Sequence, residues 1–297
     1  LFSANTYARL PGIVPRGVPV IVSERCVDSW KSGWQLAFDR KLRDRMSAMT
    51  ANSESVKSFY AETVGVAPER IVVIPNAMPG FVSGVDAGTC PTAASPGNPQ
   101  TSVSLRRDFG LPRDARVVGF VGRLAPQKRV TDLVWAFQLL QQVMENVRLV
   151  LIGDGPERNA LAEFAKGLGC RDLIVFAGHQ PRAMQYLQQL DVFCLPSSFE
   201  GMSNSLMEAM AAGVPVVASD IEANRELIEH NVTGLVVPVG NGVELTRALR
   251  RLLQDQQLCH RLSSAARRLI SERHTVELLV RRHMELYGSA LCSVPKP

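Results

Sequence analysis

The chain has 297 residues, 46% of them hydrophobic and 21% charged, which is enough for two domains with a sizeable core. No apolar run reaches the ~18 residues of a membrane-spanning helix, and the six cysteines lack the paired spacing of a zinc site. The formal net charge of +5 fits an anionic small molecule or an anionic membrane surface, but it is also ordinary for an Arg-rich soluble protein.

The first residues, LFSANTYARLPG, contain neither a start methionine nor the regions of a signal peptide. Together with the unpaired cysteines, this predicts a cytoplasmic protein in a reducing compartment. Peripheral contact with the inner face of the membrane is the further location that we expect.

Residues 1–76 show the alternation of apolar runs and helical periodicity that is typical of an α/β domain. The expected strands are 18–23, 46–50 and 71–74, and the expected helices are 6–10 (a helix end), 30–46 and 53–64. Residues 77–105 are dominated by Gly, Pro, Ser, Thr and Ala without periodicity. This composition predicts a flexible linker, with a structured insertion as the alternative.

Residues 106–272 predict a second and complete α/β domain, and residues 273–297 a last helix with a disordered tail. The expected strands are 117–121, 148–152, 173–176, 192–195 and 214–218, followed by a turn and strand over 232–238. The expected helices are 130–144, 203–212, 222–230, 242–254, 256–271 and 274–290. Strand, helix and strand in succession imply right-handed crossovers and a parallel sheet.

The first strand of this domain ends in GRLAPQK, which places Gly122, Arg123 and Lys128 in one loop. Two cations beside a glycine turn suit a diphosphate, because Arg can hold two oxygens and Lys supplies a point charge. The alternative is an ordinary surface Arg and Lys before a helix.

The second and third strands also end in glycine turns. GDGPE begins at Gly153 and looks like a dinucleotide-binding fingerprint, but Arg158 stands where the last glycine would be, so the match is weak. The third strand leads to Gly178 and His179, and a solvated loop histidine is the ordinary interpretation of that residue.

The stretch from Asp191 to Asp220 predicts strand, loop, helix and strand, with Glu200 in the loop and Glu208 in the helix. Ligands of parallel sheets bind at the carboxyl ends of strands, where free amides at a helix N-terminus hold phosphate. A loop carboxylate there can accept hydrogen bonds from sugar hydroxyls. The alternative is a surface Glu followed by a helix-forming Glu.

The Glu-x7-Glu unit in FEGMSNSLMEAMAAGVPVVASD, with GRLAPQK, GDGPE and TGLVVP in this order, resembles the signature of retaining glycosyltransferases of the GT4 family. GVPVIVSER, MTANSESV and ERIVVIPNAM resemble the same family's acceptor-binding domain. The resemblance implies an α/β GT-B fold with two Rossmann-like, doubly wound parallel-sheet domains, the first incomplete. Residues 1–76 are then the remnant of the N-terminal acceptor-binding domain, beginning just past a histidine that lines the family's sugar site. Residues 106–272 are the nucleotide-sugar-binding domain, and 273–297 the crossing helix and tail.

The resemblance also implies roles for single residues. Arg123 and Lys128 bind the donor's phosphates, Glu208 the ribose hydroxyls and Glu200 the transferred sugar, so that Glu200, Arg123 and Lys128 are the catalytic candidates. The loop of His179 passes near the base. The implied nucleotide-sugar site consists of Gly122, Arg123, Lys128, Gly153, Gly178, His179, Glu200, Gly201, Met202, Ser203, Asn204, Ser205, Leu206 and Glu208.

The expected activity is transfer of a sugar from a UDP- or GDP-sugar to a carbohydrate or lipid-linked acceptor, with retention, in cell-envelope polysaccharide or glycolipid synthesis. We expect no cofactor, no metal and no nucleic-acid partner, because Lys and Arg stand in for a metal and no Asp-x-Asp triplet is present. The open alternatives are a truncated non-catalytic nucleotide-sugar binder and a GT-B epimerase or phosphorylase. An NAD-dependent oxidoreductase is disfavoured by the incomplete fingerprint.

Overall fold

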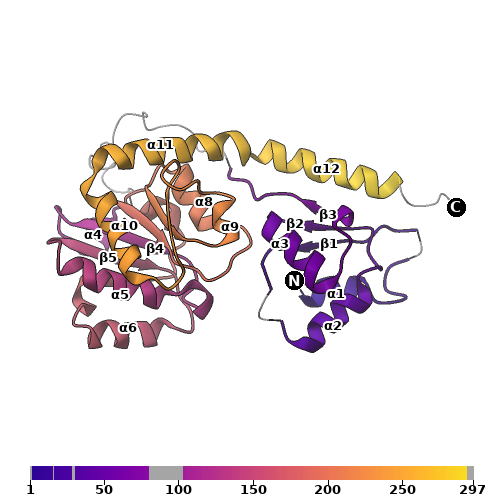
Figure 1. The fold of residues 1–297 in the computed structure, drawn as a ribbon, viewed down its shortest axis with the longest axis horizontal. Coiled ribbons are helices and arrows are strands. Elements are labelled where there is room, and N and C mark those ends of the chain that lie inside the picture. Colours follow the sequence, from indigo (N-terminus) through magenta and orange to yellow (C-terminus); the bar gives the residue numbers. More distant parts are fainter. Residues whose placement is uncertain (1, 16, 29–30, 80–102, 293–297) are drawn as a thin grey trace. The chain divides into compact units, whose positions relative to one another are not determined.

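The computed structural model describes residues 2–15, 17–28, 31–79 and 103–292 (Figure 1). They form two compact units. The first unit comprises Leu1–Pro79, Phe199–Met202 and Arg273–Pro297, and the second comprises Gly80–Ser198 and Ser203–Glu272. Most of the expected linker 77–105 and the expected tail 293–297 lie outside the described residues.

The first unit contains a parallel sheet of three strands in the order β1-β2-β3. The strands are β1 (Ile21–Glu24), β2 (Ala48–Ala51) and β3 (Ile71–Val73), close to the predicted ranges. Ile21 pairs with Ala48, and Met49 pairs with Ile71. Every residue of β2 is buried, as expected for a central strand of a parallel sheet.

The helical segments of the first unit are α1 (Phe2–Ala8), α2 (Gly33–Leu42), α3 (Glu54–Phe59), η1 (Tyr60–Val64), η2 (Pro68–Arg70) and α12 (Val276–Cys292). The prediction of one helix over 30–46 is wrong in length. The Gln35 side chain accepts a hydrogen bond from the Ser32 backbone amide at 2.9 Å, which starts the helix at Gly33. Arg45 donates to Leu42 in a turn that ends it.

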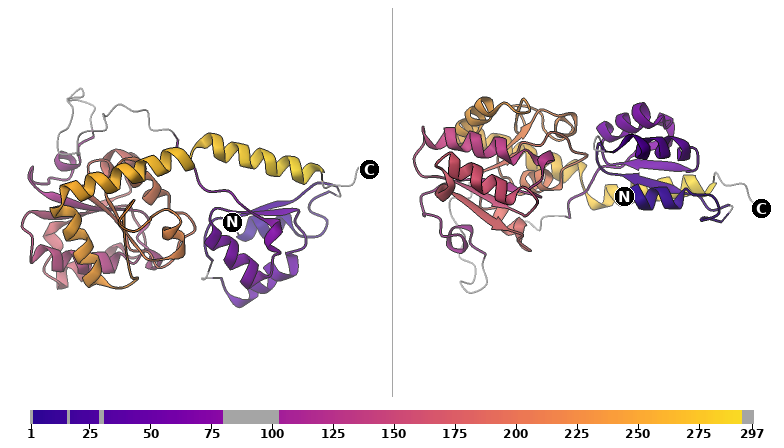
Figure 2. Two further views of the ribbon diagram at one scale, coloured as in Figure 1. Left: turned by 45° about the horizontal axis from the view of Figure 1, so that its top comes forward. Right: turned by 90° about the horizontal axis from the view of Figure 1, so that it is seen from below.

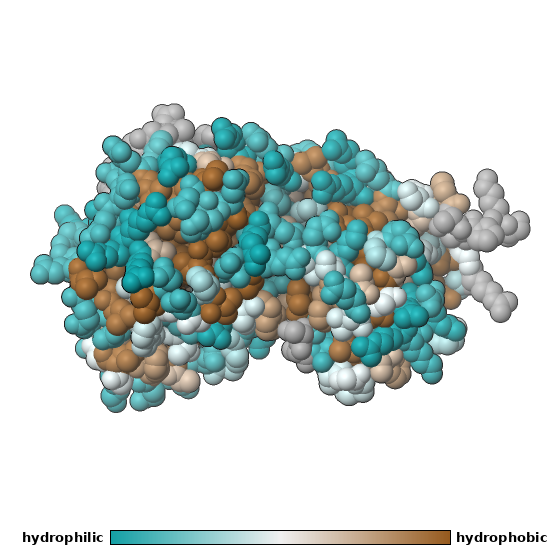
Figure 3. Space-filling view, viewed as in Figure 1, coloured by the Kyte–Doolittle hydropathy of each residue, from teal (hydrophilic) through white to brown (hydrophobic). Residues whose placement is uncertain are grey.

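Helix α12 packs on the sheet of its own unit through Leu279 and Leu286, which contact Ala48 and Ile74. Val280, Met284 and Leu291 of the same helix are exposed. Apolar side chains reach the surface in both units (Figure 3). In the described ranges no helix combines the length and the apolar character that crossing a bilayer requires.

The second unit contains a parallel sheet in the order β6-β5-β4-β7-β8-β9. Its strands are β4 (Arg116–Val121), β5 (Val147–Ile152), β6 (Ile174–Gly178), β7 (Val192–Leu195), β8 (Val216–Ser219) and β9 (Leu235–Val237). The turn and strand predicted over 232–238 are confirmed, since the Val232 and Thr233 amides bond to the Glu229 carbonyl in a turn and β9 follows at Leu235.

The helical segments of the second unit are α4 (Leu105–Asp108), η3 (Pro126–Lys128), α5 (Val130–Gln141), α6 (Arg158–Gly167), η4 (Arg171–Leu173), α7 (Ala183–Leu187), α8 (Asn204–Ala211), α9 (Glu222–Arg225), α10 (Gly242–Gln254) and α11 (Gln256–Arg273). The helix predicted over 222–230 is wrong in length. Leu227 bonds back only three residues, to Asn224, so the regular helix stops after one turn.

The direction of the crossovers reverses inside this sheet. From β4 the chain goes outward to β5 and β6, whereas from β7 it goes the other way to β8 and β9. Right-handed crossovers that run in opposite directions place their helices on opposite faces, so the sheet is doubly wound (Figure 2). Between β4 and β7 lies a topological switch point, the place where parallel sheets form a ligand crevice at the carboxyl ends of their strands.

The core of the second unit is apolar. Helix α5 buries one apolar face, namely Val130, Leu133, Val134, Phe137 and Leu140, whereas Met144, inside the helix range expected from the sequence, lies beyond the helix end and is half-buried. Phe120 and Leu149 on the sheet are fully buried. At ~1.5–3 kcal/mol for each large apolar side chain, this packing holds the strand ends at the switch point in place.

Candidate functional site

The loops that follow β4 and β7 are tied together at the switch point. The Ser198 amide donates to the Gln127 carbonyl at 2.9 Å, and the Ser198 hydroxyl donates to the same oxygen at 3.1 Å. These bonds place the GRLAPQK loop beside the start of the Glu-x7-Glu stretch, which the sequence separates by some seventy residues.

The glycine turns after β4, β5 and β6 also lie side by side. The Gly122 amide donates to the Ile152 carbonyl, and the Gly153 amide donates to the Gly178 carbonyl at 2.8 Å. A Cβ on Gly153 would lie 1.9 Å from the Gly122 carbonyl oxygen, and the φ of Gly153 is +134°. The glycine is therefore required for backbone-to-backbone packing between two loops.

The two candidate phosphate ligands sit on the loop after β4. Arg123 is exposed and forms no ion pair within the described residues. Lys128 is half-buried at the end of η3, and its Cε lies 3.9 Å from the position that a Cβ on Gly122 would take. The structure therefore brings Lys128 back to the glycine at the end of the strand, a geometry suited to an oxyanion.

Helix α8 begins where the sequence predicted it. Ser203 occupies the N-cap position, but its side chain forms no capping hydrogen bond, and its hydroxyl lies 3.3 Å from the Ser205 hydroxyl instead. Asn204 is exposed and Leu206 is buried. Glu208 is half-buried one turn further on, and this burial raises the pKa of its carboxyl group.

Glu200, Gly201 and Met202 belong to the first unit, although Arg123, Lys128 and Glu208 belong to the second. Glu200 is only 7% exposed. Gly201 pairs with Cys26 in an antiparallel bridge, and the Asn76 side-chain amide donates to the Met202 carbonyl at 3.1 Å. The fixed position of this short loop inside the first unit was not predicted from the sequence.

The remaining predicted site residues lie where β6 ends, Gly178 as its last residue and His179 directly after it. Gly178 has a φ of +67°, which favours glycine, and His179 is exposed. A base-binding role for His179 stays a prediction. Through the described ranges, no three His, Cys, Asp or Glu side chains gather as a metal site.

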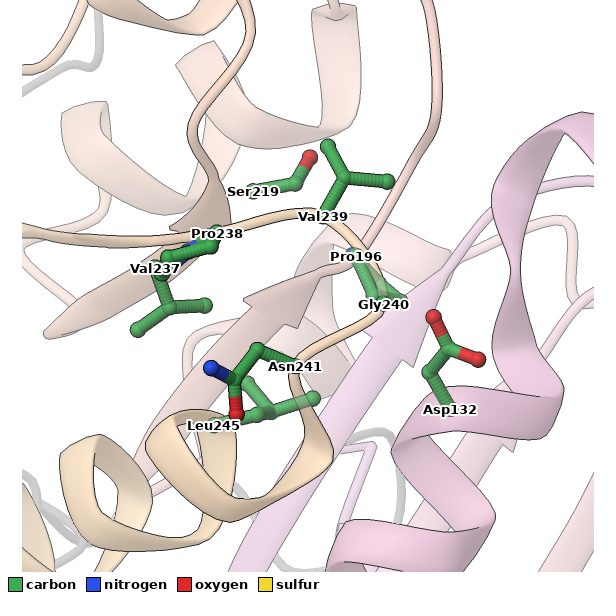
Figure 4. Close-up of a pocket in the computed structure, with 9 residues that line it drawn as sticks. All are labelled: Asp132, Pro196, Ser219, Val237, Pro238, Val239, Gly240, Asn241 and Leu245. Carbon is green, nitrogen blue, oxygen red and sulfur yellow. The ribbon is translucent and has the colours of Figure 1, made fainter.

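A small pocket opens at the carboxyl ends of β7, β8 and β9 (Figure 4). Asp132, Ser219 and Asn241 provide its polar groups. A larger and more open hollow shares Asp132 and adds Trp135 and Phe164. None of the predicted site residues lines either hollow, so the candidate phosphate site is a separate place on the same edge of the sheet.

Residues 103–269, more than half of the chain, match the family described as "Glycosyl transferases group 1". The chain belongs to the group 1 glycosyl transferases. Residues 1–79 of this group 1 chain match the family described as "Glycosyltransferase Family 4". Both matches confirm the family that the sequence motifs resemble.

Two curated relatives of this group 1 chain illustrate the family. The lipopolysaccharide core biosynthesis glycosyltransferase LpsD of Rhizobium meliloti (strain 1021) is 34% identical over 182 residues, which cover 61% of this chain and 52% of LpsD. The 2-deoxystreptamine glucosyltransferase of Streptomyces kanamyceticus is 29% identical over 253 residues, which cover 80% of this chain and 62% of that enzyme. The chain thus spans about half to three-fifths of the length of these relatives.

Solved structures share the fold. Anabaena Alr3699/HepE in complex with UDP superimposes with a TM-score of 0.77 at 26% identity, covering 91% of this chain and 72% of HepE. A second structure of the same protein contains UDP-glucose. The GT-B architecture expected from the sequence is confirmed by these neighbours and by the two parallel sheets.

Proposed function

We propose that the chain transfers a sugar from a nucleotide-diphosphate-sugar, a UDP-sugar in the first place, to an acceptor hydroxyl with retention of the anomeric configuration. One observation carries the proposal. The switch point between β4 and β7 gathers Arg123, Lys128 and the N-terminus of α8 on the edge where parallel sheets bind ligands. The UDP and UDP-glucose complexes of the similar HepE protein support UDP over GDP.

The leaving group of this reaction is a nucleoside diphosphate, on which negative charge builds up as the glycosidic bond breaks. Arg123 and Lys128 bind its phosphate oxygens, and the first-turn amides of α8 add the positive end of the helix dipole. Cations held where charge develops lower the barrier without having to reorganise. In this scheme the two side chains supply the charge that a bound metal ion supplies in other transferases.

The donor's two sugars are assigned to two carboxylates. Glu208 accepts hydrogen bonds from the ribose hydroxyls, and Glu200 accepts them from the transferred sugar. A carboxylate accepts hydrogen bonds best when ionised. Because burial raises the pKa of Glu208, nucleotide affinity should fall as the pH is lowered through that raised value.

The acceptor is proposed to be a carbohydrate or a lipid-linked sugar of the cell envelope. The similarity to LpsD, a lipopolysaccharide core enzyme, supports this choice. A lipid-linked acceptor would bring the protein to the membrane surface, and the exposed Val280, Met284 and Leu291 of α12 offer apolar contacts for it.

Calorimetric titration with UDP, GDP, ADP and UDP-glucose tests the donor site. UDP should bind saturably, and Arg123→Ala should weaken UDP binding about 10- to 100-fold, the equivalent of one or two charge-assisted hydrogen bonds, while leaving uridine binding unchanged. Arg116→Ala, at the opposite end of the same strand, is the matched control. Equal losses for UDP and uridine in Arg123→Ala would contradict the phosphate role.

Incubation of the chain with UDP-glucose and a panel of sugar and lipid-linked acceptors tests the reaction. Glu200→Gln should reduce transfer far more than it reduces UDP binding, because Glu200 contacts only the sugar. Conversion of UDP-glucose to an epimer in the absence of any acceptor would contradict the proposed transfer and identify the activity as epimerisation. Saturable UDP binding without either reaction would contradict the proposed transfer and indicate a non-catalytic nucleotide-sugar-binding protein.

A further inference from the structure

Each strand of the first unit's sheet is followed by a polar residue at its carboxyl end. Arg25 follows β1, Asn52 follows β2, and Asn76 comes three residues after β3. The carboxyl ends of parallel strands meet at one edge of the sheet, so these three side chains lie together. The loop Phe199–Met202, which carries Glu200, belongs to the same unit.

The loop touches the sheet closely. A Cβ on Gly201 would lie 2.1 Å from the Arg25 carbonyl oxygen and 2.7 Å from Asn52 Oδ1. Asn52 donates from Nδ2 to that same carbonyl at 3.2 Å, so the end of β1 is fixed where the loop crosses it. Gly201 is required here because any side chain would push the loop off the sheet.

Asn76 is the residue that connects these parts. It is 6% exposed, and its Oδ1 accepts a hydrogen bond from Arg25 Nη2 at 2.6 Å. Since that bond fixes which end of the amide faces Arg25, Nδ2 must point the other way, where it donates to the Met202 carbonyl at 3.1 Å. The orientation of the Asn76 amide is thus set by Arg25 and passed on to the loop.

The backbone of Asn76 is held as well. His274 Nδ1 lies 3.1 Å from the Asn76 carbonyl oxygen, which can only accept, so the ring nitrogen must donate. Burial lowers the pKa of His274, an effect that its bond to Asn76 only partly offsets, and this favours a neutral ring with its proton on Nδ1. Asn76 therefore has little freedom in either its backbone or its side chain.

We propose that Asn76 is a positioning residue for Glu200: the hydrogen-bond chain from Arg25 through the Asn76 amide to the Met202 carbonyl sets the conformation of the loop that carries Glu200. The proposal rests on the function proposed above, in which Glu200 contacts the transferred sugar. Two neighbours of Glu200 in sequence are held from the first unit, Gly201 by its backbone pairing and Met202 by Asn76. Because the loop is already ordered before the sugar binds, little of the binding free energy is lost in ordering it.

The substitution Asn76→Asp separates this role from general packing. An aspartate keeps the size and the acceptor for Arg25, but it has no proton to donate to Met202. Hydrogen exchange of a peptide covering 196–206 should speed up about tenfold, since a buried carbonyl loses its partner, while peptides from β2 and β3 keep their protection. Asn241→Asp makes the same change at a helix cap that only accepts, and should leave the loop unaffected.

Kinetics then show whether the loop acts through Glu200. With UDP-glucose as donor, Asn76→Asp should lower kcat by about 10- to 100-fold, in line with the cost of displacing a reacting group by ~1 Å, and UDP affinity should stay within about twofold. In a Glu200→Gln background the same substitution should change kcat by less than about twofold, because the group that it positions is already lost.

Different failures are distinguishable. Unchanged loop exchange in Asn76→Asp would overturn the anchoring, and independent, multiplying effects of the two substitutions would overturn the positioning role. Absence of turnover in the unsubstituted chain, together with faster loop exchange in the variant, would reject the proposed function and support the anchor. If Asn76→Asp also unfolds β2 and β3, Arg25→Ala is the variant to test instead. It removes the exposed donor to Asn76 Oδ1, so the Asn76 amide can rotate, and only the loop should loosen.

Discussion

Both units contain a parallel sheet, but the side chains buried around the two sheets differ in kind. In the second unit the buried strands β4, β5, β7 and β8 carry almost only apolar side chains. In the first unit a cluster of ionisable side chains is buried where β1 ends. This Lys31 cluster consists of Arg9, Glu24, Asp28, Lys31, Asp39 and Tyr60.

Lys31 is the member of the cluster that contacts all three carboxylates. Lys31 Nζ lies 3.0 Å from Asp39 Oδ2, 3.1 Å from Asp28 Oδ2 and 3.8 Å from Glu24 Oε1. Arg9 pairs with Asp39 at 2.6 Å, and the Tyr60 hydroxyl donates to Asp28 at 2.7 Å. The cluster thereby joins β1, α2 and η1 to Arg9, the residue that directly follows α1.

The charges of the cluster do not balance if every group is ionised, since three carboxylates face two cations. Burial raises the pKa of Glu24, against the smaller opposing effects of Lys31 and Asn5, so the cluster takes up a proton on Glu24 more readily than a free carboxyl group does. Burial also disfavours the charged form of Lys31, but Glu24, Asp39 and Asp28 outweigh it and raise the pKa of Lys31.

The two sheets are therefore stabilised by different kinds of interaction. The contribution of an apolar core to the free energy of unfolding increases with its buried area and decreases gradually as side chains are shortened. A buried ionic cluster contributes little net stability, because the cost of desolvating its charges offsets their attraction. Removal of one member, however, leaves a buried charge without a partner, which is strongly destabilising. The first unit should therefore respond to single charge changes, and the second to single cavities.

The largest effect is expected for Lys31→Met. It leaves three carboxylates around an apolar side chain, and the first unit should lose about 3–5 kcal/mol of unfolding free energy. Urea unfolding followed by hydrogen exchange of a peptide from β2 measures this loss. Lys166→Met, at an exposed position of α6, is the control and should change the unfolding free energy by less than about 0.5 kcal/mol.

A cavity in the second unit is the counterpart. Leu149→Ala, at a fully buried position of β5, should cost about 3 kcal/mol, and the cost should be the same at every pH because no titrating group is involved. The exchange of a β5 peptide reports it, with Val143→Ala at an exposed site for comparison. A cost that varied with pH would show that this core is also electrostatically tuned.

A smaller effect with a definite sign is expected from Glu24→Gln. Since the folded-state pKa of Glu24 lies above its ordinary 4.5, the proton contributes stability that is fully present below pH 4.5 and is lost as the pH rises through the raised value. The glutamine keeps the acceptor for Asn5 and does not titrate. The first unit of the variant should therefore gain stability relative to the native chain as the pH rises, and the opposite trend would mean that folding lowers the pKa of Glu24 instead of raising it.

The smallest effect is expected at the surface. Arg247 and Glu244 form an i,i+3 pair on α10, but both side chains are largely exposed. Arg247→Ala should change the unfolding free energy of the second unit by only about 0.3–0.5 kcal/mol, and less at high salt. A loss as large as that of Lys31→Met would erase the distinction between buried and exposed charges on which the comparison rests.

The sequence alone determined the class of the sheets, the order of most elements, the family and the loops of the candidate site. It could do so because the period of apolar residues is local, and because each motif lies at the carboxyl end of a strand that the same period predicts. Short helices such as α9 and the ends of α2 were misjudged, since single side-chain and turn hydrogen bonds end them.

Only the tertiary structure decided which unit holds the Glu200 loop and which groups surround Lys31. The Asn76–Met202 bond joins residues 126 positions apart, and the His274–Asn76 contact spans 198 positions. No local pattern encodes such pairs, because a polar residue in the sequence looks the same whether it will face water or a partner. Burial makes the difference, since an unpaired polar group in the interior costs several kcal/mol and so must find its partner when the chain folds.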